Sequence, residues 1–310
     1  MAVVTDSAVS DPAVSDPAVS DPAVSDPAAP TVRDVVAALD QRYPRAWAEQ
    51  WDRVGPVLGD FDAAVGRVLC VVDCVPETVD EALAVGAHLI VAHHPLLLRP
   101  VSSLAPDTHK GRIVHRLIRA GVALYTAHTN ADVADPGVSD ALAACLGLTA
   151  VRPLVPAAGA AAGEGRGIGR IGELDEPMRF DAFTARVAQR LPGTAAGVRA
   201  AGQADRTVRV VAVCGGAGDG FLADAARAGV DAYLCADLRH HPATEHLADG
   251  GPALLDVAHW ASERPWLDEL AGWLRRRFPV DVQVSDVDTD PWTLRAGGDQ
   301  AIAMTKESLS

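Results

Sequence analysis

Three short stretches of the sequence place histidine and carboxylate side chains where they could bind metal ions. They are Val91–Pro95 (VAHHP), Thr126–Asp132 (TAHTNAD) and Asp256–Glu263 (DVAHWASE). Each begins in or just after a short apolar run of the kind that forms a buried strand. In an open α/β fold the ends of such strands converge on one crevice, which is the usual place for a ligand. The sequence therefore predicts a site for divalent metal ions where the three runs end.

His93 and His94 are the first two expected ligands. Neighbouring residues within a strand point to opposite faces, so both could not serve one site in mid-strand. Pro95 ends the hydrogen-bond ladder and favours extended or turn geometry for the residue before it. At such a turn two imidazoles can diverge around a cavity and hold two ions rather than one.

Carboxylates and a third histidine complete the expected set. His259 and Glu263 are four residues apart, so they share a face if a helix begins there. Asp132 would add a hard oxygen ligand. A bridging carboxylate in such a set suits two ions that lie roughly 3.5–4 Å apart.

Single histidines in α/β proteins are more often hydrogen-bonded packing residues than metal ligands. The recurrence of the pattern at three strand ends favours a metal site here. No cysteine belongs to the set, which argues against a purely structural zinc site. Imidazole and carboxylate ligands accept zinc, iron, manganese or nickel, and a site with few protein ligands per ion leaves room for water to be activated as a nucleophile. A hydrolase is the natural interpretation.

Other polar groups near the same strand ends could move protons or orient ligands. His128 and His240 are the preferred acid–base candidates, with Asp237 and His241 nearby in the sequence. The alternative is that either histidine caps a helix or binds a backbone carbonyl. The turn Gly215–Gly220 could cradle a phosphate at a helix N-terminus, although close packing of a helix on a strand explains it equally well.

Together these stretches resemble a known family, the GTP cyclohydrolase 1 type 2 homologues, also called Nif-three-like dinuclear metal-centre proteins. The resemblance extends from about Val32 to Leu294. It rests on six motifs in the family's order: Glu49–Gly55, His93–Pro95, His128–Asp132, Gly215–Gly218, Asp237–His241 and His259–Glu263.

The resemblance implies two divalent metal ions per chain, held by His93, His94, Asp132, His259 and Glu263. It implies GTP as the substrate, with metal-activated water opening the imidazole ring of the purine and releasing formate. It also implies a ring-shaped homohexamer with its sites facing the interior. Many members carry an extra domain inserted in mid-chain, where this sequence has a stretch rich in Gly and Ala. From the residues alone, a phosphoesterase or amidohydrolase acting on another small molecule and a non-catalytic metal-binding or trafficking protein both remain open.

Composition limits the partners. The 310 residues carry a formal net charge of −14, from 41 acidic and 27 basic side chains. Such a surface repels nucleic acid and anionic membranes, whereas a free nucleotide can still bind beside metal cations. No basic residue precedes Arg33 and no apolar stretch is long enough to span a membrane, so we expect a cytoplasmic protein. Five cysteines without a Cys-x-x-Cys pair are expected to be buried reduced thiols.

The predicted organisation is two similar lobes. Residues 1–30 contain four copies of Ala-Val-Ser-Asp-Pro and are expected to be disordered. Residues 31–150 form a first α/β lobe, 151–167 a linker, 168–295 a second α/β lobe and 296–310 a flexible tail. Strands alternate with helices in both lobes, which favours largely parallel sheets in an α/β/α three-layer arrangement.

An internal duplication is expected to relate the lobes, which would be intertwined. Each half contains a His-His-Pro triplet, at 93–95 and 240–242, followed by a helix and an apolar strand that ends in Ala-His. A last strand at 280–284 is predicted to complete the second lobe. Equivalent strand ends would then face each other across one cleft.

Overall fold

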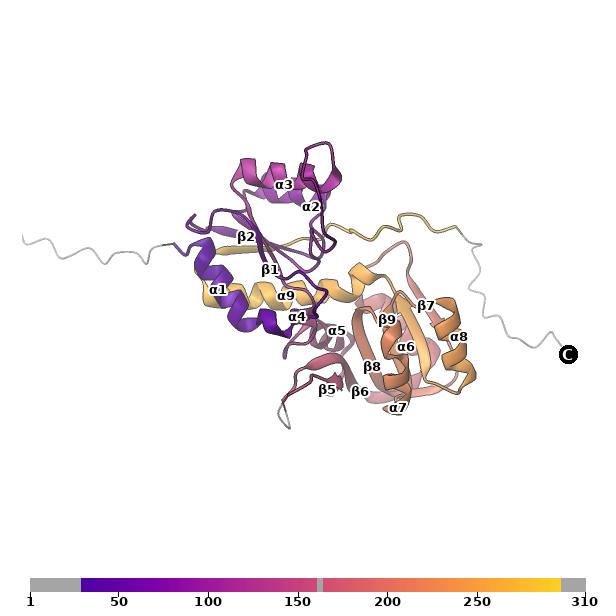
Figure 1. Cartoon of the computed structure of the whole chain (residues 1–310). Helices are drawn as coiled ribbons and strands as arrows, with labels where there is room; N and C mark the ends of the chain where they lie inside the picture. The colour runs from indigo at the N-terminus through magenta and orange to yellow at the C-terminus, as the bar shows by residue number, and fades with distance from the viewer. Residues whose placement is uncertain (1–28, 161–163, 297–310) are drawn as a thin grey trace, which may run out of the picture.

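The computed structural model describes residues 29–160 and 164–296. Nearly all of the predicted disordered stretch at 1–30 and of the tail at 296–310 lies outside these residues. The described chain forms two β-sheets, each with helices on both faces, and one long helix, α9 (His259–Arg277), passes between them (Figure 1). The predicted α/β/α fold with two lobes is confirmed.

Sheet 1 forms the upper lobe in Figure 1 and has the strand order β1-β4-β3-β2-β11. Its last four strands run parallel, and β1 is antiparallel at one edge. Helices α2 (Pro76–Val85) and α3 (His109–Ala120) cover one face, and α1 (Val32–Arg42) and α9 cover the other. The strands are β1 Gly55–Leu58, β2 Arg67–Val71, β3 Leu89–Ala92, β4 Ala123–Thr126 and β11 Asp281–Val284.

Sheet 2 has the order β5-β6-β8-β9-β10-β7, with β8, β9 and β10 parallel and the other three strands antiparallel to their neighbours. Helices α5 and α6 pack on one face, α7 and α8 on the other. The strands are β5 Thr149–Pro156, β6 Gly167–Arg179, β7 Val198–Ala201, β8 Thr207–Ala217, β9 Ala232–Ala236 and β10 Ala253–Val257. The helices are α4 Thr129–Asp132, α5 Val138–Leu146, α6 Phe180–Arg190, α7 Leu222–Arg227 and α8 His240–Ala248, with 3-10 turns at Arg45–Trp47 and Asp219–Phe221.

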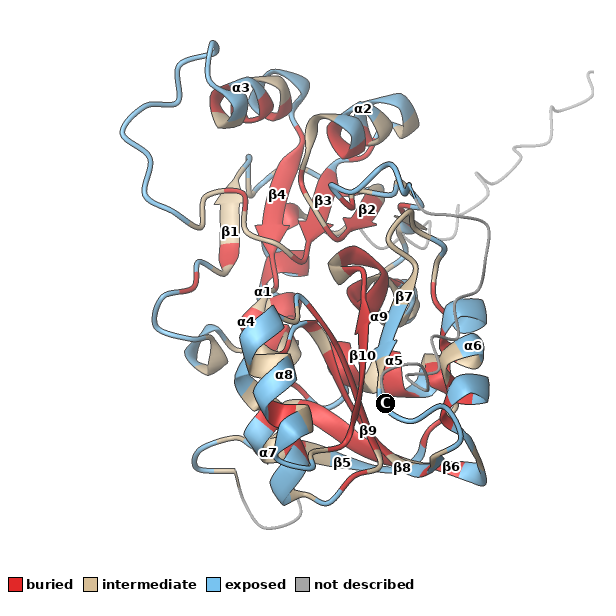
Figure 2. Cartoon of the chain, turned by 90° about the vertical axis from the view of Figure 1, so that its right-hand side faces the viewer, coloured by how far each residue is buried: buried red, intermediate tan, exposed pale blue. Residues whose placement is uncertain are grey.

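Alternating side chains explain why the central strands are buried on both sides. In β2, Val68 and Cys70 pack with α1 and α9, whereas Leu69 and Val71 pack with α2 and α3. All four are fully buried, and the central strands β2, β3, β4, β9 and β10 are red in Figure 2, whereas the edge strands β1 and β7 are mostly tan and pale blue. Burial of an aliphatic side chain such as Val68 or Leu69 stabilises the fold by about 1.5–3 kcal/mol. The rigid strand ends are therefore a firm support for a site.

Local signals in the sequence explain where several helices begin. Thr31 caps α1, with a capping box in which Asp34 accepts hydrogen bonds from the backbone N–H and hydroxyl of Thr31. Such a cap is worth about 1 kcal/mol. Helix α2 begins with Pro76, whose missing N–H would have had no partner in the first turn.

The order of elements supports the internal duplication. The first half runs α1-β1-β2-α2-β3-α3-β4, and the second runs α6-β7-β8-α7-β9-α8-β10. In both sheets the first strand of the unit lies antiparallel beside the last one. The two halves are therefore two copies of one folding unit.

The His-His-Pro triplets, however, are not structurally equivalent, and this part of the prediction is wrong. His93 directly follows β3, whereas His240 comes four residues after the end of β9, in the first turn of α8. The equivalent residues are His128 and His259, which both stand two positions beyond a strand, after β4 and β10. Each is followed four residues later by an acid, Asp132 or Glu263.

Two further expectations need correction. Residues 151–156 of the predicted linker belong to β5, an edge strand whose single neighbour is β6; an edge tolerates Pro153 because one side of the strand needs no donors. The last strand, β11, belongs to sheet 1 rather than to the second lobe. Helix α9, at 1.5 Å per residue, is about 28 Å long and carries the chain back across the molecule.

The five cysteines are free thiols, and four of them are buried. Burial raises the pKa of the Cys70 thiol to about 12, so it stays protonated. Within residues 29–160 and 164–296, no helix has the length and hydropathy needed to cross a bilayer.

Candidate metal centre

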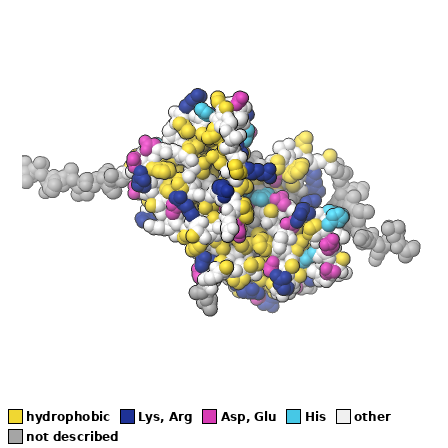
Figure 3. Space-filling view, in the orientation of Figure 1, with side chains coloured by type: hydrophobic (Ala, Val, Ile, Leu, Met, Phe, Trp, Pro, Cys, Tyr) yellow, Lys and Arg dark blue, Asp and Glu magenta, His cyan; other side chains and the backbone are white. Residues whose placement is uncertain are grey.

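Four imidazole rings and one carboxylate meet between the two lobes. His93 and His94 follow β3, His128 follows β4, and His259 opens α9 with Glu263 one turn further on. The ring centroid of His94 lies 4.9 Å from that of His93, 5.5 Å from that of His128 and 5.1 Å from that of His259. Figure 3 shows histidine and acidic side chains at the surface where the two lobes meet.

Glu263 is the centre of the cluster. Its Oε1 lies 3.0 Å from Nε2 of His259 and 3.4 Å from Nε2 of His93, and its Oε2 lies 3.1 Å from Nε2 of His94. The side chain of Glu263 is only 3% exposed. Both carboxylate oxygens thus face imidazole nitrogens, which is the arrangement of a carboxylate that could bridge two cations.

Each histidine is held from behind through its other ring nitrogen, Nδ1. The partner of His93 is the carbonyl of Ala127, at 2.8 Å. The other three partners are carboxylates: Asp73 for His94 at 2.7 Å, Asp52 for His128 at 2.8 Å and Asp237 for His259 at 2.7 Å. Such partners fix the tautomer and ring orientation of metal-binding histidines and leave Nε2 free for the ion.

Asp132 lies at the edge of the cluster, in the last position of α4. Its Oδ1 is 3.7 Å from Nε2 of His93. Removal from water raises the pKa of Asp132, although the nearby imidazoles oppose this effect. The structure therefore brings together all five residues that the sequence predicts as ligands, with Asp132 the most distant.

The unpaired atoms of the cluster fit a divalent cation. Among the described residues, the buried atoms His93 Nε2, Asp132 Oδ1 and Glu263 Oε2 make no hydrogen bond of good geometry, although Oε2 of Glu263 lies 3.1 Å from Nε2 of His94. Buried polar atoms are rarely left unpaired, because each costs about 1–3 kcal/mol. Imidazole nitrogen and carboxylate oxygen are common ligands of zinc, iron, manganese and nickel. Two groups have ligand atoms within 4.8 Å of one another: His93, His94 and His128, and His94, His259 and Glu263.

His128 therefore stands among the possible ligands, although the sequence analysis assigns it an acid–base role. His240 is not part of the cluster. It lines a separate cavity of about 240 Å³, beside α8 and β7. The structure does not bring the two predicted acid–base histidines together.

Gly216, in the glycine-rich turn that the sequence analysis considered for phosphate, packs against the cluster instead. It has φ +70°, and a Cβ atom there would lie 2.4 Å from Oε1 of Glu263 and 3.0 Å from Nε2 of His259. Its N–H donates to the hydroxyl of Ser262 at 2.8 Å. Only glycine permits this close approach of β8 to the start of α9.

From the sequence, Asp52 could be either an acid near the metal ions or a turn-forming residue, and the structure makes it the partner of His128. Asp73, the partner of His94, was not predicted. An aspartate after a strand or turn is a common residue with many roles, and it carries no signal of its own. Asp237 was expected among the polar groups that could move protons or orient ligands, and in the structure it follows β9 directly and adopts φ +58°. Such strained backbone in a non-glycine residue often marks a functional position.

A cleft of about 940 Å³ opens from the cluster. His94, His128 and His259 line one part of it, and residues of β7, β10 and the C-terminal segment line the rest. This volume is within the range of roughly 300–1,000 Å³ that is typical of sites for small molecules.

Comparisons with known proteins identify the family and agree with the fold. A family model described as Duf34/NIF3 (NGG1p interacting factor 3) matches residues 30–291. A Streptomyces coelicolor protein named GTP cyclohydrolase 1 type 2 homolog is 52% identical over 271 residues, covering 85% of this chain and 94% of that protein. A Mycobacterium tuberculosis protein with the same name is 39% identical over 375 aligned positions, covering 86% and 98%. The solved structure of a Staphylococcus aureus hypothetical protein matches with a TM-score of 0.77 at 28% identity, covering 86% of this chain and all of that one.

The fold and the cluster define a class of two-lobed α/β proteins with candidate metal-binding histidines between the lobes. The chain belongs to the DUF34/NIF3 family, as its sequence motifs predict. The mycobacterial alignment is longer than this chain, so that relative contains segments that are missing here.

Metal uptake by protein that has been stripped with a chelator should release protons. Burial disfavours a charged ring at His259, but the charge of Glu263 and the hydrogen bond to Asp237 outweigh it and raise the pKa of His259 to about 10. A metal ion needs the neutral imidazole, so at about pH 8 it must displace a proton, and affinity should increase with pH. Calorimetry in buffers of different ionisation enthalpy measures the release, which should be smaller in Asp237→Asn. Uptake without proton release would contradict this assignment.

Proposed function

We propose that the protein is a metal-dependent hydrolase that holds two divalent metal ions between its lobes. The observation that carries this proposal is the convergence of three Nε2 atoms on both oxygens of Glu263, with every ring fixed from behind. The proposed ligands are His93, His94, Asp132, His259 and Glu263. Five carboxylates surround the four imidazoles, and divalent cations would neutralise this excess of negative charge: Asp52, Asp73, Asp132, Asp237 and Glu263.

Bound divalent ions would supply Lewis acidity and activate water as a nucleophile. His128, whose ring centroid lies 5.2 Å from that of His93 and 5.5 Å from that of His94, would complement them. Burial alone would raise the pKa of Asp52, but hydrogen bonds from His128 and Thr129 hold it well below its usual range. The ionised Asp52 favours a proton on Nδ1 of His128, which leaves Nε2 to bind an ion or to accept a proton from a reacting group.

The substrate class that we propose is a purine nucleotide, GTP, whose imidazole ring is opened by hydrolysis with release of formate. Two features support it: the cleft is large enough for a nucleotide, and the relatives from S. coelicolor and M. tuberculosis are named GTP cyclohydrolase 1 type 2 homologs. The hexameric assembly, the cytoplasmic location and the absence of nucleic-acid and membrane partners stay predictions from the sequence.

Formate release from GTP by the metal-loaded protein tests the proposal. We expect turnover by the wild type and none by His94→Ala. The matched control is His109→Ala, because His109 is an exposed histidine at the start of α3, and it should behave as the wild type. Turnover of phosphoesters or amides instead of GTP, lost in His94→Ala, would identify another hydrolase. Metal binding with no turnover of any of these compounds would refute the catalytic role.

A further inference from the structure

The wall of the cleft beyond the metal centre is built by two segments that are distant in sequence. One is residues 195–197 with the start of β7, from the second copy of the folding unit. The other is residues 289–295, which follow β11 out of sheet 1. Thr289 donates a hydrogen bond to Asp73, the same carboxylate that holds His94. The C-terminal segment is therefore hydrogen-bonded to a carboxylate that holds one of the histidines of the metal centre.

Acidic side chains in this cleft already have partners. Asp73 and Asp237 bind imidazoles, as described above. Asp256 accepts hydrogen bonds from Arg199 and from the backbone N–H of Leu238. Asp290 is 6% exposed and accepts from the N–H of Trp292 at 2.8 Å. These carboxylates are therefore less repulsive to an anion than their number suggests.

Arg295 is different from the other charged residues that line the cleft. Among the described residues it has no carboxylate partner. One of its terminal nitrogens, Nη1, lies 3.3 Å from the position that a Cβ atom would take on Gly197. Gly197 immediately precedes β7, and Arg199 is two residues further along. The two arginines thus belong to the same wall, which does not include the metal centre.

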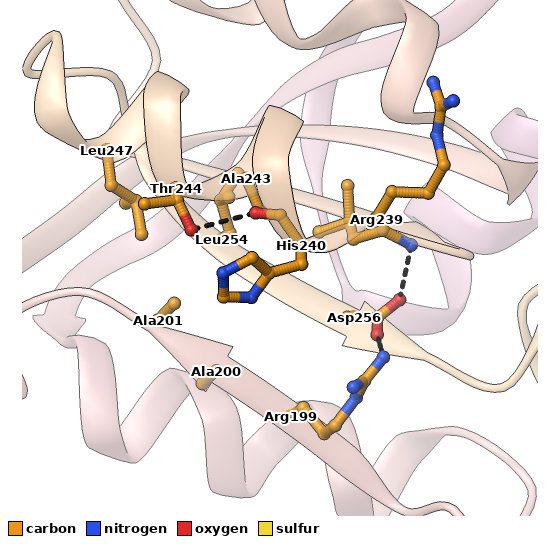
Figure 4. A pocket seen from close by; sticks show the side chains of 11 residues that line it. Arg199, Ala200, Ala201, Arg239, His240, Ala243, Thr244, Leu247, Leu254 and Asp256 are labelled. Atoms are coloured by element: carbon orange, nitrogen blue, oxygen red, sulfur yellow. Dashed lines mark hydrogen bonds and ion pairs between the residues drawn. The ribbon is translucent and has the colours of Figure 1, made fainter.

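Arg199 stands between the cleft and the smaller cavity that contains His240. Figure 4 shows its guanidinium pointing towards Asp256, while the ring of His240 lies on the other side of the small cavity. The Arg199 side chain is 74% exposed, so it remains accessible to a ligand while paired. A guanidinium held by one carboxylate still has N–H groups available for a second anion.

We propose that Arg295, together with Arg199, binds the phosphate groups of the nucleotide substrate. This inference rests on the proposed function, and it adds an orientation. Phosphates can also bind metal ions, so a nucleotide could lie in this cleft in two orientations: with its phosphates at the metal centre or with its phosphates at the arginines. Anchoring of the phosphates at the arginine wall directs the purine ring towards His94, His128 and His259, where its hydrolysis is proposed to occur. The apolar side chains of Trp292 and Leu294 also line this cleft.

Calorimetric titration of the metal-loaded full-length protein with GTP and with guanosine tests this arrangement. Loss of a charged hydrogen bond costs a factor of about 10 or more in affinity. We expect Arg295→Ala to bind GTP about 10-fold more weakly than the wild type, with an unchanged affinity for guanosine and an unchanged metal content. The GTP affinity of Arg295→Lys should fall between those of the wild type and Arg295→Ala, because lysine keeps the charge but loses the planar fork. Arg119→Ala, an equal loss of charge on the exposed end of α3, should have no effect.

Equal GTP affinities of Arg295→Ala and Arg119→Ala would overturn the proposal, as would a failure of the wild type to prefer GTP over guanosine. The measurement of GTP affinity is independent of whether the protein hydrolyses GTP. If binding of GTP depends on Arg295 but no formate appears, the phosphate site stands and the hydrolase proposal fails. If formate appears and Arg295→Ala has no effect on affinity, the hydrolase proposal stands and the phosphate site fails.

Discussion

Replacement of Glu263 by glutamine should remove most of the bound metal. This residue offers both oxygens to three imidazoles, so glutamine keeps the shape but loses the charge and one acceptor oxygen. Loss of an outer partner of a metal ligand typically lowers affinity by roughly 10–100-fold, and loss of a residue that would itself be a ligand should exceed this. Elemental analysis after dialysis is the measurement, and we expect less than one ion per chain.

Glu173→Gln is the matched control. Glu173 is a partly exposed acid of β6, and its ion-pair partner among the described residues is Arg209 rather than a histidine of the cluster. This variant should retain the metal content of the wild type. Circular dichroism would establish that Glu263→Gln is folded. A folded Glu263→Gln protein that keeps two ions would show that Glu263 is not a ligand, and the dinuclear proposal would be wrong.

Replacement of Arg170 by methionine should strongly destabilise the fold. Arg170, on β6, is 1% exposed, and its guanidinium binds Asp140 of α5 at 2.7 and 2.6 Å and the carbonyls of Gly167, Gly169 and Ala134. Breaking a buried ion pair by removing one partner costs about 3–5 kcal/mol, because the other charge is left without compensation. Urea denaturation should show a decrease of this size in the free energy of unfolding.

Arg33→Met provides the comparison. Arg33 pairs with Asp62 on the surface, where both side chains are mostly exposed, so its loss should cost no more than about 1 kcal/mol. The double variant Arg170→Met/Asp140→Asn should be more stable than Arg170→Met alone, since it removes the uncompensated charge. Equal effects of Arg170→Met and Arg33→Met would contradict this account of the buried pair.

Several features follow from local chemistry and could be predicted from the residues alone. Helices of the first half begin at local signals, such as the N-cap Thr31 of α1 and Pro76 in the first position of α2, which act within one turn. The expected ligands lie where apolar strands end, and the spacing of His259 and Glu263 is that of one helical face. Parallel strands place their ends at one edge of a sheet, so the histidines that follow β3 and β4 had to be close together. The approach of His259 and Glu263, which follow β10 of the other sheet, depends on how the two lobes pack.

Other features depend on which distant segments pack together. The pairing of β11 with β2 joins residues about 200 positions apart, and nothing in the sequence of either strand specifies which sheet edge is free. Asp52, Asp73 and Asp237 became partners of histidines only because separate loops meet behind the imidazole rings. The same holds for Arg295, whose position in the cleft depends on the return of the chain through α9. Local patterns thus predict the elements and the ligand types, whereas contacts over long sequence separations, which depend on the packing of the whole core, define the partners.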